Sequence, residues 1–142
     1  LFSHAERYGL PIDSNGFVYS WKAVNSKFRD KYSDTVSYSP GRTVTIDRKR
    51  CELDPTIACG AGLHSGATKY VLEYGSNIDD RFLLVKFNPK DIISCPGDAS
   101  WQKLRACKLK IVKEIKKSDI LPLGDTYMGS VKQKRNKLGQ FC

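Results

Sequence analysis

Alternating apolar and polar residues predict strands in several segments of the chain. Residues 17–24 read Phe-Val-Tyr-Ser-Trp-Lys-Ala-Val, and this period of two is typical of a strand. Residues 81–87 form a second apolar run, which ends at the turn-forming pair Asn88 and Pro89. The β-branched residues at 43–46 favour a third, shorter strand.

Residues 104–115 fit both a helix and a strand, and we interpret them as a strand. Lys108 and Lys110 alternate with apolar residues there, but the parity of the apolar positions changes near Ala106 and Cys107. A change of parity within one strand implies a β-bulge. The expected strand therefore carries a bulge at this point.

Helical spacing and glycines predict the remaining elements. Apolar and aromatic residues at helical spacing favour a helix over 67–74, and a short helix is expected over 2–8. Residues 59–66 contain three glycines, which predicts a sharp turn or a close approach of the backbone. Residues 92–93 are expected to form a short extended segment after the strand at 81–87.

These elements predict an α+β fold. We expect one small domain over residues 1–124, with a mixed or antiparallel sheet covered by one or two short helices, as the C-terminal part of a longer protein. Residues 125–142 are expected to form a basic, flexible tail. The predicted core consists of Phe17, Tyr19, Trp21, Leu63, Val71, Leu83, Val85, Leu109 and Ile111.

The charge of the chain is concentrated near its C-terminal end. The formal net charge is +9, and residues 103–142 hold 11 basic and 3 acidic residues, a net charge of +8. Such a block predicts a basic stripe that crosses a sheet face or edge, continues into the tail and binds an anionic partner. A solvated strand face is the alternative. The candidate binding residues are Lys103, Arg105, Lys108, Lys110 and Lys113, together with His64 in the glycine-rich turn.

Motifs for several enzyme classes are absent from the sequence. It has no phosphate-binding loop, dinucleotide fingerprint, hydrolase elbow or zincin motif, and no apolar run approaches the roughly 20 residues of a membrane-spanning helix. We therefore expect no catalytic residues, no cofactor and no metal. An alternative metal site would combine Cys51, Cys59 and His64 with Cys95 or Cys107, although buried, reduced thiols are the simpler interpretation of the cysteines.

Five segments, taken in their order along the chain, resemble a known family. They are Leu10-Pro11-Ile12-Asp13, Gly16-Phe17 with Trp21-Lys22-Ala23-Val24, Cys59-Gly60-Ala61-Gly62-Leu63-His64, Val85-Lys86-Phe87-Asn88-Pro89-Lys90-Asp91-Ile92-Ile93-Ser94 and Lys103-Leu104-Arg105-Ala106-Cys107. In this order they resemble the rIIB-like proteins of bacteriophages over residues 9–115. The chain departs from the family pattern at Trp21, where tyrosine is usual, at Cys95, where valine is usual, and in an insert around 76–80.

This resemblance implies a viral accessory protein without enzymatic activity. The expected partner is a viral or host protein, such as an rIIA-like protein. The expected location is the host cytoplasm or the inner face of the host membrane, with the virion as a further option. The implied role is escape from host exclusion or defence. Binding of nucleic acid or of an anionic membrane surface through the basic stripe is an alternative.

A second, shorter resemblance leads to an enzyme. Residues 60–64, a helix with two tyrosines and the strand at 82–85 are similar to segments of ADP-ribosyltransferases of the poly-ADP-ribose-polymerase type. That resemblance would place Lys22 where the family has histidine, His64 where it has tyrosine, and Glu114 as the late glutamate. We keep an ADP-ribosyltransferase-like fold or activity as an alternative function.

Overall fold

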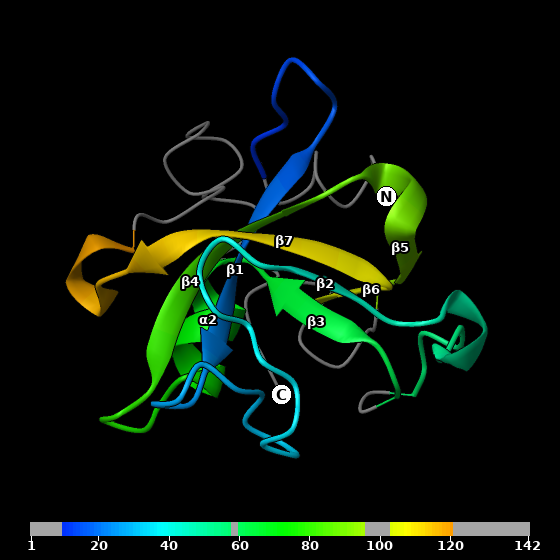
Figure 1. Cartoon of the computed structure of the whole chain (residues 1–142). Coiled ribbons are helices and arrows are strands. Elements are labelled where there is room, and N and C mark those ends of the chain that lie inside the picture. Colours follow the sequence, from blue (N-terminus) through cyan, green and yellow to red (C-terminus); the bar gives the residue numbers. More distant parts are fainter. Residues whose placement is uncertain (1–9, 58–59, 96–102, 121–142) are drawn as a thin grey trace.

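Short strands dominate the computed structural model, which describes residues 10–57, 60–95 and 103–120 (Figure 1). The strands are β1 (Val18–Val24), β2 (Thr43–Thr45), β3 (Leu63–Gly66), β4 (Arg81–Phe87), β5 (Ile92–Ser94), β6 (Lys103–Ala106) and β7 (Lys108–Ile115). The α-helix of the described residues is α2 (Thr68–Tyr74), and 3-10 turns span η1 (Arg48–Arg50), η2 (Pro89–Asp91) and η3 (Lys117–Asp119).

Four of the predicted elements are confirmed to within one residue at each end. They are the strands at 17–24, 43–46 and 81–87 and the helix at 67–74. The helix expected at 2–8 and the tail at 125–142 lie outside the described residues. No helix among the residues described has the length and apolar character needed to cross a membrane.

All seven strands belong to one antiparallel sheet with the order β2-β7-β4-β1-β3-β6-β5. The fold is therefore strand-rich, and α2 is its α-helical part among the described residues. The prediction of an α+β domain with an antiparallel sheet is confirmed in this coarse sense, but the helical share is small.

The single strand predicted at 104–115 is wrong. Its two halves, β6 and β7, flank Cys107 and lie in opposite halves of the sheet order. The amide of Cys107 donates to the carbonyl of Asp91, and its carbonyl accepts from Ile46. The sheet must therefore curl until its two ends meet at Cys107. The bulge of this region lies at Val112, because Leu84 pairs with Lys113 whereas Val85 pairs with Ile111.

The glycine-rich segment is also more regular than predicted. Its second half is strand β3, which pairs with β6 from Leu63 opposite Ala106 to Gly66 opposite Lys103. The turn is thus confined to the first glycines, before Leu63.

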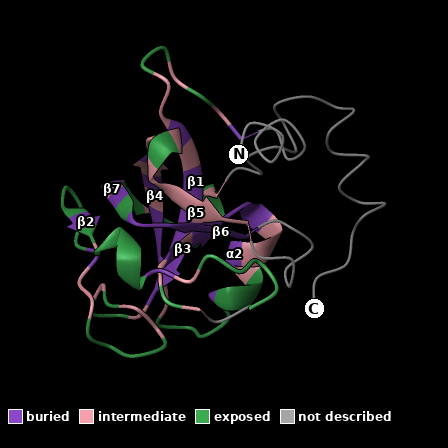
Figure 2. Ribbon diagram, turned by 90° about the vertical axis from the view of Figure 1, so that its right-hand side faces the viewer, coloured by how far each residue is buried: buried purple, intermediate pink, exposed green. Residues whose placement is uncertain are grey.

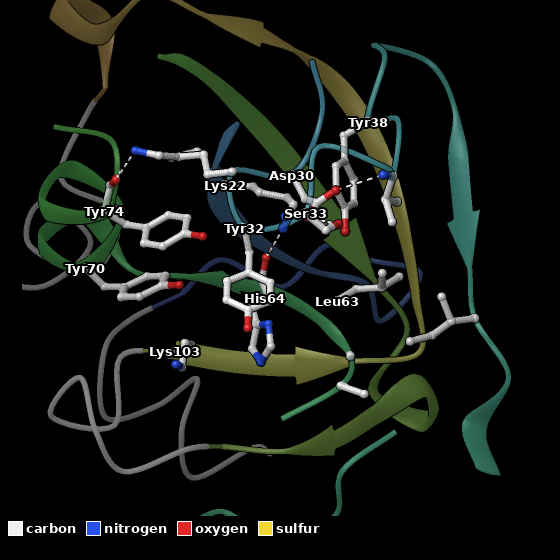
Figure 3. Close-up of a pocket in the computed structure, with 16 residues that line it drawn as sticks. Lys22, Asp30, Tyr32, Ser33, Tyr38, Leu63, His64, Tyr70, Tyr74 and Lys103 are labelled. Carbon is white, nitrogen blue, oxygen red and sulfur yellow. Dashed lines mark hydrogen bonds between the residues drawn. The ribbon is translucent and has the colours of Figure 1, made fainter. Parts of the chain in front are cut away.

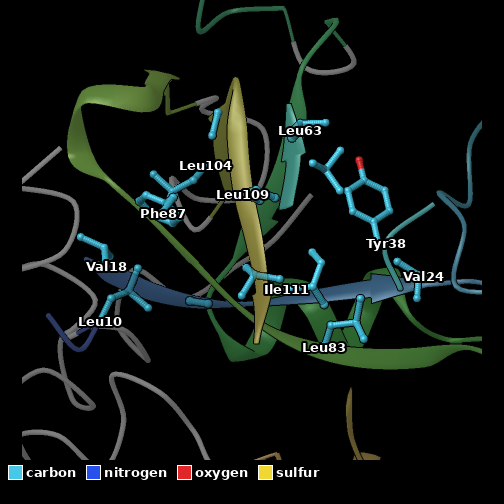
Figure 4. Close-up of a cluster of buried hydrophobic side chains, with 14 residues drawn as sticks. Leu10, Val18, Val24, Tyr38, Leu63, Leu83, Phe87, Leu104, Leu109 and Ile111 are labelled. Atoms are coloured by element: carbon cyan, nitrogen blue, oxygen red, sulfur yellow. The ribbon is translucent and has the colours of Figure 1, made fainter. Parts of the chain in front are cut away.

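The concave face of the curled sheet encloses the main hydrophobic cluster (Figure 4). Strand β1 contributes Val18 and Val24 to it, and the neighbouring strands contribute the rest of the aliphatic core. Figure 2 shows the buried residues following the strands, whereas the connecting loops are mostly exposed. The predicted core residues Leu63, Leu83, Val85, Leu109 and Ile111 belong to this cluster.

A second cluster lies on the opposite face of the sheet, beneath α2. Trp21, Ala23 and Phe82 pack there against Val71 of the helix, and the indole nitrogen of Trp21 donates to the hydroxyl of Thr68 at 3.2 Å. Both faces of β1 are therefore covered at this end. Phe17 and Tyr19 share the parity of Trp21 but are only half-buried, so their assignment to the core was wrong: α2 is too short to reach them.

Truncation of Leu83 tests the main cluster. Leu83→Ala should lower the free energy of unfolding by about 2 to 5 kcal/mol, because the side chain is fully buried and leaves a cavity. Ile78→Ala is the matched control, since Ile78 is 98% exposed and its truncation should change stability by less than about 0.5 kcal/mol. Denaturant unfolding measures both. Equal effects of the two substitutions would contradict this core.

Candidate functional site

The candidate basic residues do not form one continuous stripe. Arg105 is 0% exposed and Lys103 is buried, both on β6, whereas Lys108 and Lys113 are exposed on β7. The expectation of a surface stripe through Lys103 and Arg105 was wrong, because the curl at Cys107 sends the two halves of the segment to different parts of the sheet. The predicted continuation into the tail lies outside the described residues.

The guanidinium of Arg105 holds the loop at residues 52–57. Its Nη1 donates to the carbonyls of Glu52 at 2.8 Å and Asp54 at 3.2 Å and to the hydroxyl of Ser94 at 3.2 Å, and its Nη2 donates to the carbonyl of Ile57. A guanidinium offers five N–H donors in a planar fork. The loop at residues 52–57 forms no strand, and Arg105 thus donates buried hydrogen bonds to its carbonyl groups.

Two glycines of the predicted turn make room for this side chain. A Cβ at Gly62 would lie 2.4 Å from Cγ of Arg105. One at Gly60 would lie 3.2 Å from Cζ of Arg105 and 2.4 Å from Cβ of Glu52. Gly62 also has a φ of +151°, which favours glycine. The predicted close approach of the backbone is confirmed, and the group that approaches is Arg105.

His64 is held neutral by its surroundings. The Nε of Arg105 donates to its Nε2 at 3.2 Å, so that nitrogen is the acceptor and the ring proton sits on Nδ1. Burial, together with the cations Lys22, Lys103 and Arg105, lowers the pKa of His64 to about 3. At neutral pH the imidazole therefore offers one N–H donor and carries no charge.

Lys22 is a buried cation that the sequence analysis named through the transferase resemblance but did not select as a binding residue. The side chain is 7% exposed, its Nζ donates to the carbonyl of His64 at 2.5 Å, and it lies 4.2 Å from the centre of the Tyr38 ring. Burial lowers its pKa to about 8, although the Asp30 carboxylate acts in the opposite direction. The sequence signal for its burial was its position between Trp21 and Ala23, in a strand with apolar residues on both faces.

Lys22 occupies a gap between two strands. Strands β1 and β3 pair at Trp21 opposite Gly66, whereas β1 and β4 pair along seven residues. Beyond that contact, the Lys22 ammonium donates to the backbone carbonyl of His64 on β3. In a continuous ladder, a backbone amide of β1 would donate to such a carbonyl. The strands diverge here, and a pocket opens at their divergence.

This Lys22 pocket has a volume of about 390 Å³ (Figure 3). Cationic and aromatic side chains dominate its polar lining. Its polar and aromatic lining residues are Lys22, Asp30, Lys31, Tyr32, Ser33, Tyr38, His64, Tyr70, Tyr74 and Lys103. The rings of Tyr70 and Tyr74 stack with their centres 5.9 Å apart and extend from α2 into the pocket (Figure 3).

The loop between β1 and β2 forms one wall of the pocket and is organised by Asp30. Burial opposes ionisation of this carboxyl, but hydrogen bonds from Ser33, Val36 and Thr35 outweigh it and lower its pKa to about 2. Both carboxylate oxygens thus accept hydrogen bonds from Asp30's own loop. Lys31, at the rim, pairs with Asp80.

A separate group of lysines surrounds a depression of about 300 Å³ at one end of the sheet. We call Lys86, Lys90, Lys108 and Lys110 the lysine cluster; Asp91 is the acidic residue beside it. Lys86 and Lys110 stand directly opposite each other on β4 and β7, an arrangement in which like charges repel. The ammonium groups of Lys90 and Lys108 make no hydrogen bond or ion pair with the described residues. Lys113 lies elsewhere, beside Trp21 and Leu84.

The alternative sites weighed from the sequence do not come together. No group of three His, Cys, Asp or Glu residues that could hold a metal ion occurs in the described part of the chain, and Cys59 falls outside it. Lys22 and His64 both line the Lys22 pocket. Glu114, however, pairs with Arg81 at 2.9 Å and does not line that pocket, so the three positions suggested by the transferase resemblance are not assembled.

Comparison with known proteins identifies the family. The family model described as "Bacteriophage T4 protein rIIB" matches residues 1–126. The chain belongs to the rIIB family. It is 34% identical over 115 residues to the protein rIIB of Enterobacteria phage T4, an alignment that covers 81% of this chain and 36% of that protein. No solved structure matches the chain. The resemblance to rIIB-like proteins is thereby confirmed, and two of its motifs supply Gly60, Gly62, His64 and Arg105.

Removal of the Arg105 guanidinium should loosen the loop that it holds. Arg105→Met should lower the free energy of unfolding by about 2 to 4 kcal/mol, since several acceptors lose their donors. Amides of residues 52–57 should also exchange hydrogen faster. Arg42→Met, at an exposed position, is the control and should leave both quantities unchanged. Unaltered exchange in the Arg105 variant would refute the role of Arg105 in the loop.

The pKa of His64 predicts acid sensitivity. Between pH 6.5 and about 3 the unfolded chain binds a proton at His64 that the folded chain does not, so the free energy of unfolding decreases as the pH falls through this window. In His64→Gln the amide oxygen still accepts from Arg105 but does not titrate. The wild type should therefore lose up to about 1.4 kcal/mol per pH unit relative to the variant. Parallel stability curves for the two proteins would show that His64 titrates normally.

Proposed function

We propose that the chain is a non-enzymatic interaction domain of a phage accessory protein, and that its lysine cluster binds an acidic surface of a viral or host protein. The chain spans 36% of the length of its T4 relative, so this proposal concerns the domain alone. Membership of the rIIB family supports a role in a phage-infected cell. An rIIA-like partner and a role against host exclusion are the specific forms of this proposal.

The opposed pair of Lys86 and Lys110 is the observation that carries it. Placing like charges directly opposite on adjacent strands costs stability. Four lysines line the depression beside one acidic lining residue, Asp91, and Asp13 is a further carboxylate that acts on Lys86. An anionic partner relieves this repulsion. Lys90 and Lys108 are the best contacts for it, because no neighbour in the described residues engages their ammonium groups.

A protein partner suits this surface better than a nucleic acid. Nucleic-acid backbones are bound along an extended basic track, whereas burial of Lys103 and Arg105 shortens the track to a compact cluster. Stacking of bases needs exposed aromatic rings beside the charges. Of the two aromatic residues that line the depression, Phe87 is buried and Phe17 is half-buried with the Lys86 ammonium over its ring. A compact basic cluster fits an acidic patch on a protein of matching size.

Charge reversal at the cluster tests this function. The double variant Lys90→Glu and Lys108→Glu should lose capture of its partner from phage-infected cells, and with the purified partner it should associate more slowly and with a flatter salt dependence. The matched control reverses Lys27 and Lys49, which are exposed and lie outside the cluster, and it should retain binding. Nuclease treatment should not release the captured protein.

Two results would contradict the proposal. One is equal capture by the cluster variant and the control variant. The other is complete release of the captured material by nuclease, which would favour the nucleic-acid alternative.

A further inference from the structure

The Lys22 pocket has features of a site for a small molecule, on residues that the lysine cluster does not use. Its volume of about 390 Å³ lies in the range of pockets that bind small organic ligands. Such pockets usually combine apolar or aromatic walls with a few polar groups that fix the orientation of the ligand. The Lys22 pocket has both components, because tyrosine rings line it together with Lys22 and His64.

The ammonium of Lys22 supplies a positive charge that no ion pair neutralises. It makes no salt bridge with the described residues, and its hydrogen-bond partner is the uncharged carbonyl of His64. An ammonium has three N–H donors, and the carbonyl takes one of them. Burial of a cation without a counter-ion is costly, and an anion inside the pocket would offset that cost.

The nearby carboxylate of Asp30 acts on the Lys22 ammonium through its charge but forms no direct ion pair with it. Its oxygens accept hydrogen bonds from Ser33, Thr35 and Val36 within its own loop. His64, which lines the same pocket, adds a neutral donor, because the hydrogen bond from Arg105 occupies Nε2 and leaves the proton on Nδ1. A neutral N–H donor and a cation in one pocket together favour an anionic group.

Aromatic rings define the other half of the pocket. Tyr70 and Tyr74 extend into it from α2 in a stacked arrangement (Figure 3), and Tyr38 lies beside Lys22. Stacked and edge-on contacts between aromatic rings are favourable. A planar ring on the ligand would therefore pack against these tyrosine rings, which line the same pocket as Lys22.

We propose that the Lys22 pocket binds a small aromatic molecule that carries one anionic group, a phosphate or a carboxylate. The anionic group lies against the Lys22 ammonium, and the ring packs against the tyrosines of α2. This site is independent of the proposed function, because none of the lysine-cluster residues lines the pocket.

Binding of model compounds to the full chain tests the site by calorimetry. The probes are 1-naphthyl phosphate and 1-naphthoate. Inorganic phosphate and acetate represent their anionic halves, and 1-naphthol represents the aromatic half. At least one of the two intact probes should bind saturably, with an affinity at least tenfold above that of each half, and comparison of the two identifies the preferred anion. No saturable binding of either probe up to about 1 mM, or equal binding of naphthol, would overturn the proposal.

Two variants locate the bound probe. Lys22→Met keeps the length of the side chain but removes its charge, and it should weaken binding of the better probe at least tenfold. Tyr70→Leu should weaken the same probe several-fold by removing a ring contact, which keeps the test decisive if the Lys22 variant does not fold. The control Lys49→Met removes an exposed charge outside the pocket and should bind as the wild type does. Undiminished binding by both folded pocket variants would exclude this pocket as the site.

Discussion

The buried guanidinium of Arg105 is the interaction on which the rest of the structure depends. It joins β6 and His64 of the paired strand β3 to the loop at 52–57, which belongs to no strand. A buried cation is tolerated when its donors are satisfied, and here carbonyl oxygens, a hydroxyl and an imidazole satisfy them. Gly62 and the fixed tautomer of His64 are consequences of this single placement, because the arginine stem needs the missing side chain and the arginine Nε needs an acceptor.

The same arrangement explains why the chain has two separate basic regions. Arg105 and Lys103 stay on β6, inside the molecule. Two residues after Arg105 the chain turns at Cys107 and carries Lys108 and Lys110 to the opposite half of the sheet order. Burial and these inner cations lower the pKa of His64, and Lys103 lines a pocket with aromatic walls. The outer lysines Lys86 and Lys110 face each other in register across β4 and β7. The inner and outer basic residues thus lie in different surroundings, although they are neighbours in the sequence.

Local patterns predicted the elements better than the way the elements meet. Residues 81–87 were predicted to the residue, because a run of apolar residues ends at Asn88 and Pro89. The break at Cys107 was read as a bulge, since periodicity records only a change of parity and carries no information about a partner strand. Which residues of β1 point into the main core was misjudged, because both faces of that strand are covered at one end. His64 was selected because glycines surround it in the sequence. The burial of Lys22 was not predicted, because a lysine in an alternating strand normally faces solvent.

Side-chain NMR of Arg105 tests the central claim most directly. With its donors bound and its side chain buried, the Nε–H and Nη–H protons of Arg105 should give separate signals that exchange slowly with water, because the hydrogen bonds hinder rotation of the guanidinium. The Nε–H signal should also shift in His64→Gln, where the acceptor changes from a ring nitrogen to an amide oxygen. Averaged, rapidly exchanging signals, like those of a solvated arginine, would contradict the account.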